Sequence, residues 1–307
     1  MLCMQQWAAF VLLGTIWGSS FLWIKIAVGE IGPATVGALR LLFGLVGLLT
    51  VSWTTRQSFR NLRAFLPAYL FMGIFNTALP FVLIPWAETR IDSALAAILN
   101  ATTPLFAIVI AHYWLSDERI TFTRATGLVV GFVGVVVLVS RDIGPQGIRG
   151  SIWGQLAMLA ASASYAVSAT FSRRHLRGHP PLAQATMVVF IADAITWGIA
   201  SITDRPLLLP VRGLTWFALI WLGLLGSCLA YLLYFYLINA WGATRTSLVT
   251  YIFPVVGLVL GIVFLNEAAD WRLIIGSALV VGGIVVVNRR VGAVTPLRRP
   301  RERPQET

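Results

Sequence analysis

The sequence NATTPLFAIVIAHYWLSDERIT, residues 100–121, has a counterpart in TYIFPVVGLVLGIVFLNEAAD, residues 250–270. In each stretch a proline lies at the start of a long apolar run that is followed by a glutamate. The two prolines, Pro104 and Pro254, are 150 positions apart. A proline inside an apolar helix removes one backbone hydrogen bond and favours a kink. The recurrence of this arrangement predicts that the chain contains one structural unit twice.

Further matches support this internal repeat. Each match is weak by itself, because glycine is common in this chain, with 27 occurrences. The matches follow one another in the same order in both halves, at offsets of 148 to 150 residues, and that order indicates a duplication. The pairs are Trp17 with Tyr165, Ser20 with Ser168, Lys25 with Arg173, Gly73 with Gly223, Trp86 with Tyr236, Glu118 with Glu267, Gly127 with Gly276 and Gly134 with Gly283.

The composition indicates whether this chain folds in water or in a membrane. Hydrophobic residues make up 58% of the 307 positions and charged residues only 11%, whereas a soluble chain carries about 25% charged residues. The charges fall between long uncharged runs, each near the roughly 20 residues that a helix needs to cross a bilayer. This pattern predicts an integral membrane protein with ten helices, at 7–28, 34–53, 64–86, 92–115, 122–140, 151–171, 182–201, 213–238, 244–265 and 271–288.

Five helices per half is an odd number, so the second half must cross the membrane in the opposite sense. The predicted fold is therefore an all-α integral membrane bundle of ten transmembrane helices, arranged as two inverted five-helix repeats. We expect the first repeat at residues 1–143 and the second at 150–290. Inverted repeats are an architecture of secondary transporters, whose substrate site lies between the halves. Residues 291–307 are polar, proline-rich and basic, and we expect a disordered cytoplasmic tail there.

The basic residues indicate the orientation in the membrane. There are 22 arginines and a single lysine. With the N-terminus inside, the cytoplasmic loops and tail hold 15 of the arginines and the opposite side holds six. This positive-inside bias places both termini in the cytoplasm. The net charge of +11 is thus explained by topology, and nucleic acid is not expected as a partner.

The residues resemble a known family. GTIWGSSFLWIKIA at residues 14–27, together with the two repeated stretches and the glycine-rich helix after each, is similar to the EamA branch of the drug/metabolite transporter superfamily. The resemblance spans nearly the whole chain. It implies a ten-helix fold with a central cavity, alternating access, and export of small metabolites, amino acids being the best-known class. The resemblance and the excess of arginine over lysine favour a bacterial inner membrane.

Polar and aromatic side chains recur at helical spacing on the helices that the resemblance implies as cavity-lining. A tyrosine or tryptophan ring offers an apolar wall with one polar atom, which suits an amphipathic ligand. The alternative is hydrogen bonding and packing between helices, which is common in membrane bundles. The candidate substrate-binding residues are Trp17, Ser20, Asn76, Asn100, Thr103, Tyr165, Ser168, Ser227, Tyr231, Tyr234 and Tyr251.

Charged residues inside the predicted helices form a second set of candidates, because a charge within the bilayer is costly. Lys25, the only lysine, either extends to the lipid headgroups or forms an outer rim that gates the cavity or attracts a carboxylate. Arg40 is an interfacial anchor, a tie to a helix end, or a functional charge. Asp193 is a partnered structural carboxylate or a proton relay. Pro104 and Pro254 are candidate hinges, although common ancestry alone explains their symmetry.

The sequence therefore predicts a secondary transporter that takes a small-molecule substrate and works within the lipid bilayer. Proton coupling stays open, and a monomer is compatible with the sequence. No cofactor, metal or enzymatic activity is expected, because no zinc-protease, phosphate-loop or catalytic-triad motif is present. The alternatives are a nucleotide-sugar or other metabolite transporter of the same fold, and further an integral-membrane enzyme or a channel.

Overall fold

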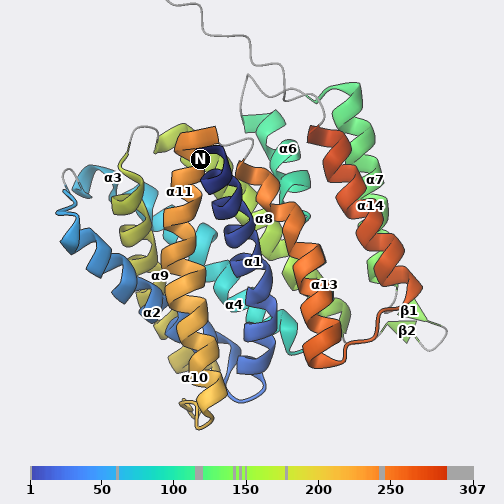
Figure 1. The fold of residues 1–307 in the computed structure, drawn as a ribbon. Helices are drawn as coiled ribbons and strands as arrows, with labels where there is room; N and C mark the ends of the chain where they lie inside the picture. Colours follow the sequence, from blue (N-terminus) through green and yellow to red (C-terminus); the bar gives the residue numbers. More distant parts are fainter. Residues whose placement is uncertain are drawn as a thin grey trace, which may run out of the picture.

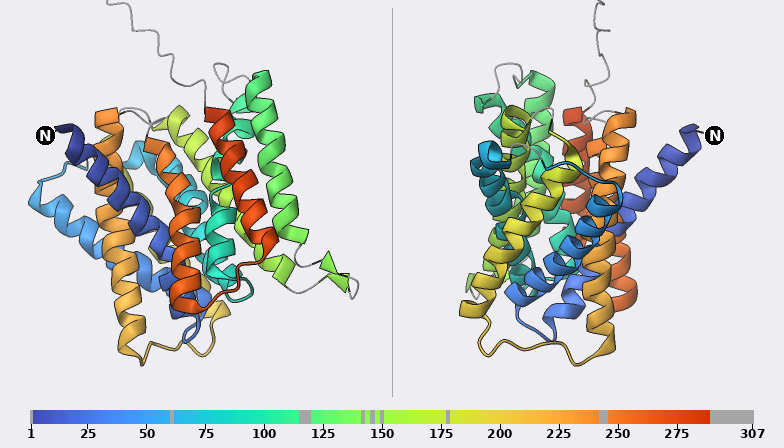
Figure 2. Two further views of the ribbon diagram at one scale, coloured as in Figure 1. Left: turned by 45° about the vertical axis from the view of Figure 1, so that its right-hand side comes forward. Right: turned by 90° about the vertical axis from the view of Figure 1, so that its left-hand side faces the viewer.

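The computed structural model is a bundle of helices with one short strand pair (Figure 1). It describes residues 2–59, 62–114, 120–140, 143–144, 147–148, 151–176, 179–241 and 246–288. The chain crosses the bundle back and forth, so its connections gather at two ends. We call the end that carries Leu2 and Asn288 the near end and the opposite one the far end (Figures 1 and 2).

Two of the apolar runs of the first half are interrupted. A π-helical turn divides the third apolar run, and a non-helical turn at 101–102 divides the fourth just before Pro104. The elements are α1 (Leu2–Val28), α2 (Pro33–Thr54), α3 (Leu62–Met72), η1 (Gly73–Ala78), α4 (Leu79–Glu88), α5 (Ser93–Asn100), α6 (Thr103–Trp114) and α7 (Phe122–Val139).

The second half repeats these irregularities. A π-helical segment again divides the third helix of the half, and a 3-10 turn begins the fourth, just before Pro254. The elements are β1 (Ile143–Gly144) and β2 (Gly147–Ile148), which pair antiparallel, then α8 (Ser151–His175), α9 (Pro181–Thr203), α10 (Gly213–Ile220), η3 (Trp221–Leu229), α11 (Ala230–Trp241), η4 (Ser247–Tyr251), α13 (Ile252–Leu265) and α14 (Trp271–Asn288).

Eight helical segments of the described chain are long and apolar enough to cross a membrane, and Trp271–Val287 is a shorter apolar helix. The helix of the sixth predicted run, α8, is not among them, because serines and alanines replace many of its larger apolar residues. The prediction of an all-helical membrane protein is confirmed to this extent. The eight segments are Met4–Val28, Pro33–Thr54, Arg63–Glu88, Ser93–Trp114, Phe122–Val139, Pro181–Thr203, Gly213–Leu237 and Leu248–Leu265.

The two halves of the bundle contact each other through corresponding segments. The most extensive contacts are those of α7 with α14 and of α2 with α9. Figure 2 shows α7 and α14 side by side over their whole length. The remaining contacts also occur in matching sets, since α1 lies against α13 and α11, while α8 lies against α6 and α4. Under the offset of about 150 residues, these contacts of α1 and α8 are counterparts of each other.

Glycines bring α7 and α14 unusually close. Gly127, Gly131 and Gly134 lie on α7 and face Gly276 and Gly283 on α14. A β-carbon at Gly134 would lie 2.7 Å from the backbone nitrogen of Val280, nearer than real side chains approach. Small residues of this kind allow helix backbones to touch, which is how helices associate in a medium as apolar as their own surfaces.

Replacing Gly283 by alanine is therefore expected to lower the temperature at which the purified protein unfolds in detergent. The added methyl group would lie 2.5 Å from the backbone nitrogen of Gly131 and 2.6 Å from the carbonyl oxygen of Gly127. Such overpacking costs about 1–3 kcal/mol. Gly282→Ala is a matched control, because a β-carbon there meets no atom within 4 Å. Equal unfolding temperatures of the two variants, followed by tryptophan fluorescence, would contradict the close packing.

Candidate functional site

A buried arginine lies in the interior between the two halves. Arg40, about 10 Å along α2 from Pro33 at helical rise, has only 8% of its surface exposed. Its Nε donates to Ser227 Oγ of η3 at 3.3 Å, and its guanidinium lies 4.3 Å from the centre of the Phe81 ring. Arg40 makes no ion pair at contact distance with any described carboxylate, so its remaining donors are available to an anionic ligand.

Trp17 of α1 forms the aromatic side of this interior. Its indole nitrogen donates to the carbonyl oxygen of Gly226 at 3.0 Å, next to Ser227. The ring centre lies 6.5 Å from that of Tyr231, 5.6 Å from that of Tyr234 and 6.1 Å from that of Phe253. The first helix of the chain thus contacts η3, α11 and α13 of the second half through one side chain.

The hydroxyl group of Tyr231 connects this aromatic side to the first half. It lies near the side chains of Asn76 and Thr77, both in the π-helical segment η1. Tyr165 of α8 lies near enough to Arg40 and Tyr231 to interact with both electrostatically. A π-helical turn widens the helix and redirects its side chains, and such turns are frequent at functional sites.

Eight of the predicted residues therefore lie together, and we call them the interior group. They combine one cation, several hydroxyl groups, one side-chain amide and four aromatic side chains. Such a set can bind a small molecule that has a carboxylate and an apolar body. The interior group is Trp17, Ser20, Arg40, Asn76, Tyr165, Ser227, Tyr231 and Tyr234.

Four other predicted polar residues take different positions. Ser168 donates to the carbonyl of Ser164 in its own helix, and Thr103 donates to the carbonyl of Asn100 at the turn between α5 and α6. Tyr251 donates to the carbonyl of Ile284 on α14 at 2.9 Å. These contacts are structural, and none of them extends to the interior group.

The remaining candidates are placed as follows. Asp193 is buried on α9, one turn before Trp197, and its Oδ1 has no hydrogen-bond partner among the described residues. Pro104 is the second residue of α6 and follows the turn at 101–102, while Pro254 is the third residue of α13 and follows the 3-10 turn. Both prolines thus lie where a helix changes direction or type.

Lys25 binds helix ends at the far end of the bundle. Its ammonium donates to the carbonyl oxygens of Glu88 and Ile91, each at 2.7 Å. These carbonyls belong to the end of α4 and the turn after it, where helices leave their carbonyl groups unpaired. A cation at a helix C-terminus is also favoured by the helix dipole.

Carboxylates cap three helix N-termini at the same end. Glu267 accepts from the backbone nitrogens of Ser93 and Ala94 at 2.7 and 2.9 Å, at the start of α5. Asp204 accepts from the Thr35 nitrogen at 2.7 Å, at the start of α2. Glu30 accepts from the nitrogens of Val211 and Arg212 and from the Thr215 hydroxyl, around the start of α10. Each carboxylate comes from the half opposite to the helix that it caps.

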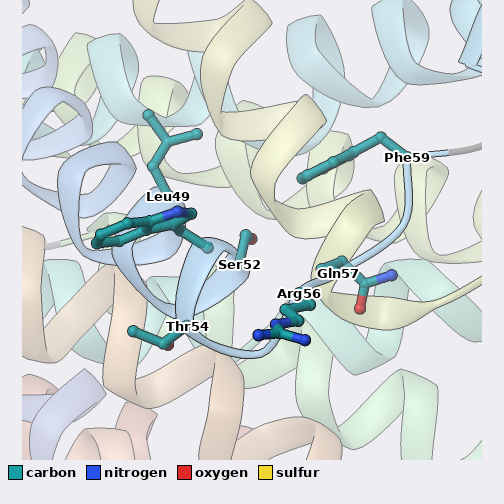
Figure 3. A pocket seen from close by; sticks show the side chains of 7 residues that line it. Leu49, Ser52, Thr54, Arg56, Gln57 and Phe59 are labelled. Atoms are coloured by element: carbon teal, nitrogen blue, oxygen red, sulfur yellow. The ribbon is translucent and has the colours of Figure 1, made fainter.

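Two hollows lie at the ends of α2. One of about 630 Å³ is at the near end and is lined by Leu49, Ser52, Trp53, Thr54, Arg56, Gln57 and Phe59 (Figure 3). The other, of about 370 Å³, is at the far end and is lined by Pro33, Ala34, Val82, Trp86, Thr89, Arg90, Thr203 and Asp204. Neither includes a residue of the interior group, so both are surface features of α2.

The structure adds residues that the sequence analysis did not select. Thr77 and Phe253 complete the surroundings of Tyr231 and Trp17. Glu88 is fully buried at the end of α4, although the sequence around it reads as a loop. Glu267 was used only as a repeat marker. Within the described residues, no cluster of three histidine, cysteine, aspartate or glutamate side chains could hold a metal ion.

Removing the Glu30 carboxylate is expected to destabilise the far end above pH 5 and to have little effect in acid. The hydrogen bond from Thr215, followed by those from Arg212 and Val211, lowers the pKa of Glu30 from its ordinary value of about 4.5. A lowered pKa contributes stability at neutral pH that is lost as the pH falls through the folded-state value. Unfolding temperatures of wild type and Glu30→Gln should differ at pH 7 and converge towards pH 3. Equal temperatures at pH 7 would contradict this.

The chain is similar to known transporters over almost its whole length. The profile of the EamA-like transporter family matches the chain twice, at residues 6–140 and 152–289. An uncharacterised transporter of Archaeoglobus fulgidus is 25% identical over 294 residues, covering 94% of this chain and 100% of the relative. A protein of Streptantibioticus cattleyicolor named "Probable terminal-alkyne amino-acid exporter" is 26% identical and covers 95% of this chain and 97% of its own length.

The fold is also similar to a solved one. A crystal structure superposes with a TM-score of 0.67 at 21% sequence identity, covering 94% of this chain and 99% of the other. At this identity the similarity concerns the fold alone. The paired match of the family profile, together with the apolar helices, is decisive, and the chain belongs to the EamA-like transporter family of multi-pass membrane proteins.

Proposed function

We propose that this protein is a secondary transporter that exports small amphipathic metabolites, most specifically amino acids, by alternating access. The observation that carries this proposal is the interior group, a buried arginine faced by aromatic and hydroxyl side chains from both halves. A site shared by two halves opens to one side or the other when the halves move relative to each other. No enzymatic activity is part of the proposal.

The proposed topology is ten transmembrane helices in two inverted repeats, residues 1–143 and 150–290, with 291–307 as a cytoplasmic tail. The contacts between the halves support the inverted repeats, because the corresponding helices α7 and α14, and α2 and α9, lie together, and α1 against α13 matches α8 against α6. The arginine distribution supports an inner membrane with both termini in the cytoplasm. The near end is then cytoplasmic and the far end faces outward.

Arg40 is proposed to bind the carboxylate of the substrate. A guanidinium forms strong paired hydrogen bonds with a carboxylate, and Trp17 and Tyr231 supply the apolar walls for a side chain. The name of the Streptantibioticus relative agrees with this class of substrate. A nucleotide sugar would need several cations for its phosphates, whereas Arg40 is the only charged member of the interior group and Lys25 is bound to carbonyls.

The far-end contacts are proposed to close the outward path in this conformation. Glu30, Asp204 and Glu267 each join one half to a helix of the other. Opening this end requires these hydrogen bonds to break, so they form a gate. Pro104 and Pro254 are proposed as paired hinges, because each lies beside a helix irregularity in corresponding positions.

Flux measurements in proteoliposomes test this function. We expect saturable uptake and efflux of at least one amphipathic amino acid from a panel that also contains nucleotide sugars, measured with and without a pH gradient. Arg40→Gln should raise the half-saturation concentration for such a substrate by roughly 10- to 100-fold, since a hydrogen bond to a charged group contributes about 1.5–3 kcal/mol. Arg40→Lys should retain part of the affinity, because it keeps the charge.

Variants of Tyr231 and Tyr236, which both lie on α11, distinguish a loss of substrate binding from a loss of folding. Tyr231→Ala and Trp17→Ala should weaken transport, whereas Tyr236→Ala should not, because Tyr236 is on the same helix as Tyr231 but is 42% exposed on the outside. Unfolding temperatures identify variants that fold poorly. Saturable flux of no panel member would overturn the transporter proposal. Flux with unchanged kinetics in Tyr231→Ala and Trp17→Ala would show that the interior group is not the site.

A further inference from the structure

Glu88 is the most completely buried carboxylate of the described chain. It ends α4, none of its surface is exposed, and neither carboxylate oxygen has a hydrogen-bond partner among the described residues. Buried carboxylates are normally paired or hydrogen-bonded, because transferring an unpaired carboxylate ion from water into the protein interior costs free energy. A group that breaks this rule inside a transporter is a candidate for a functional role.

The packing around α4 explains the burial. Gly154 brings α8 so close that a β-carbon there would lie 3.0 Å from the carbonyl oxygen of Ala87, the residue before Glu88. Phe21 and Ile24 of α1 belong to the same apolar cluster as Ala87 and Ile91. The carboxyl group is therefore enclosed by α1, α8 and the turn that follows α4, in surroundings that supply no hydrogen-bond donor to it.

Three charged groups act on Glu88 from the surrounding elements. Lys25 of α1 and Arg40 of α2 attract its negative charge, and Glu267 between α13 and α14 repels it. Glu267 is already engaged, because its two oxygens accept from the start of α5. Elsewhere, α5 carries no charged residue, and the basic residues of α8, Arg173 and Arg174, lie at its other end.

The ammonium of Lys25 lies beside Glu88 without bonding its carboxyl group. It instead binds the backbone carbonyl of Glu88 itself, at 2.7 Å, together with that of Ile91. Lys25 thus binds the main chain of Glu88, while the carboxyl oxygens of Glu88 have no hydrogen-bond partner among the described residues. This arrangement suits an acid that is neutral while the far end is closed and that ionises when Lys25 leaves the carbonyls.

We propose that Glu88 is the proton-binding site that couples transport to the proton gradient, an inference that rests on the proposed transport function. When the far end closes, a hydronium ion gives its proton to one carboxylate oxygen, so one O–H bond breaks and one forms; the reverse transfer returns the proton to water when that end opens. Arg40 connects the two events, because its guanidinium lies 4.3 Å from the Phe81 ring on α4, the helix that ends at Glu88, and it also belongs to the interior group. The charge on Glu88 thus acts on the residue proposed to bind the substrate carboxylate.

Infrared difference spectroscopy of the purified protein tests the proton site without any substrate. At neutral pH, wild type minus Glu88→Gln should show the carbonyl stretch of a protonated carboxyl group. Glu267→Gln is the matched control and should leave that band in place, because Glu267 is hydrogen-bonded as a carboxylate. Absence of the band from the wild-type difference spectrum would overturn the proposal, even if transport is found.

Flux in proteoliposomes tests the coupling. An imposed pH gradient should change wild-type flux several-fold, whereas Glu88→Gln should lose this response and still exchange labelled for unlabelled substrate. If Glu88→Gln unfolds, Glu88→Asp replaces it, and the pH at which the gradient acts should shift. An unchanged response to the gradient in these variants, or no response in wild type, would overturn the coupling. The absence of any saturable flux would instead count against the transport function, while the infrared result would still stand.

Discussion

The unpaired backbone groups at the helix ends are the constraint on which the rest of this structure depends. A helix leaves four amide groups at its start and four carbonyls at its end without partners inside the helix. At the far end, Glu30, Asp204 and Glu267 satisfy such amides on α10, α2 and α5, and Lys25 satisfies carbonyls after α4. Because each carboxylate reaches across to the other half, closing this end and satisfying the helix ends are one event.

This closure determines the surroundings of the interior group. With the far end joined, Arg40 has the Phe81 ring on one side and Ser227 on the other, and the aromatic cluster around Trp17 lies next to it. Glu88 is sealed between the closed end and this group. Opening the far end would therefore free helix ends and expose the buried Arg40 guanidinium and Glu88 carboxyl group at the same time. In the proposed mechanism, hydration of the opened end and release of the proton from Glu88 to water offset that cost, whereas proton binding favours the closed end.

The helices were predictable because the bilayer requires about 20 apolar residues per crossing, and the ten expected runs lie on helical segments of the described chain. The partners of polar groups were not predictable from spacing. Ser20 and Ser168 correspond in the repeat, yet each donates to the carbonyl four residues earlier in its own helix, a local bond open to any helical serine. Lys25 binds the backbone carbonyls of Glu88 and Ile91, which lie more than sixty residues away in sequence. The position of Lys25 on its own helix therefore could not indicate these acceptors. In the sequence, Glu88 lies between an apolar run and the polar residues Thr89 and Arg90, a pattern typical of an exposed loop. Its burial is therefore visible only in the folded structure.

The central claim is that the interior group binds the substrate through Arg40. The most direct test is a structure, determined by electron cryo-microscopy, of the protein with a transported amino acid bound. The account predicts that the carboxylate of the ligand lies within hydrogen-bond distance of the terminal nitrogens of Arg40, with its side chain against Trp17 and Tyr231. A ligand bound elsewhere, with Arg40 still held only by Ser227 and Phe81, would contradict it.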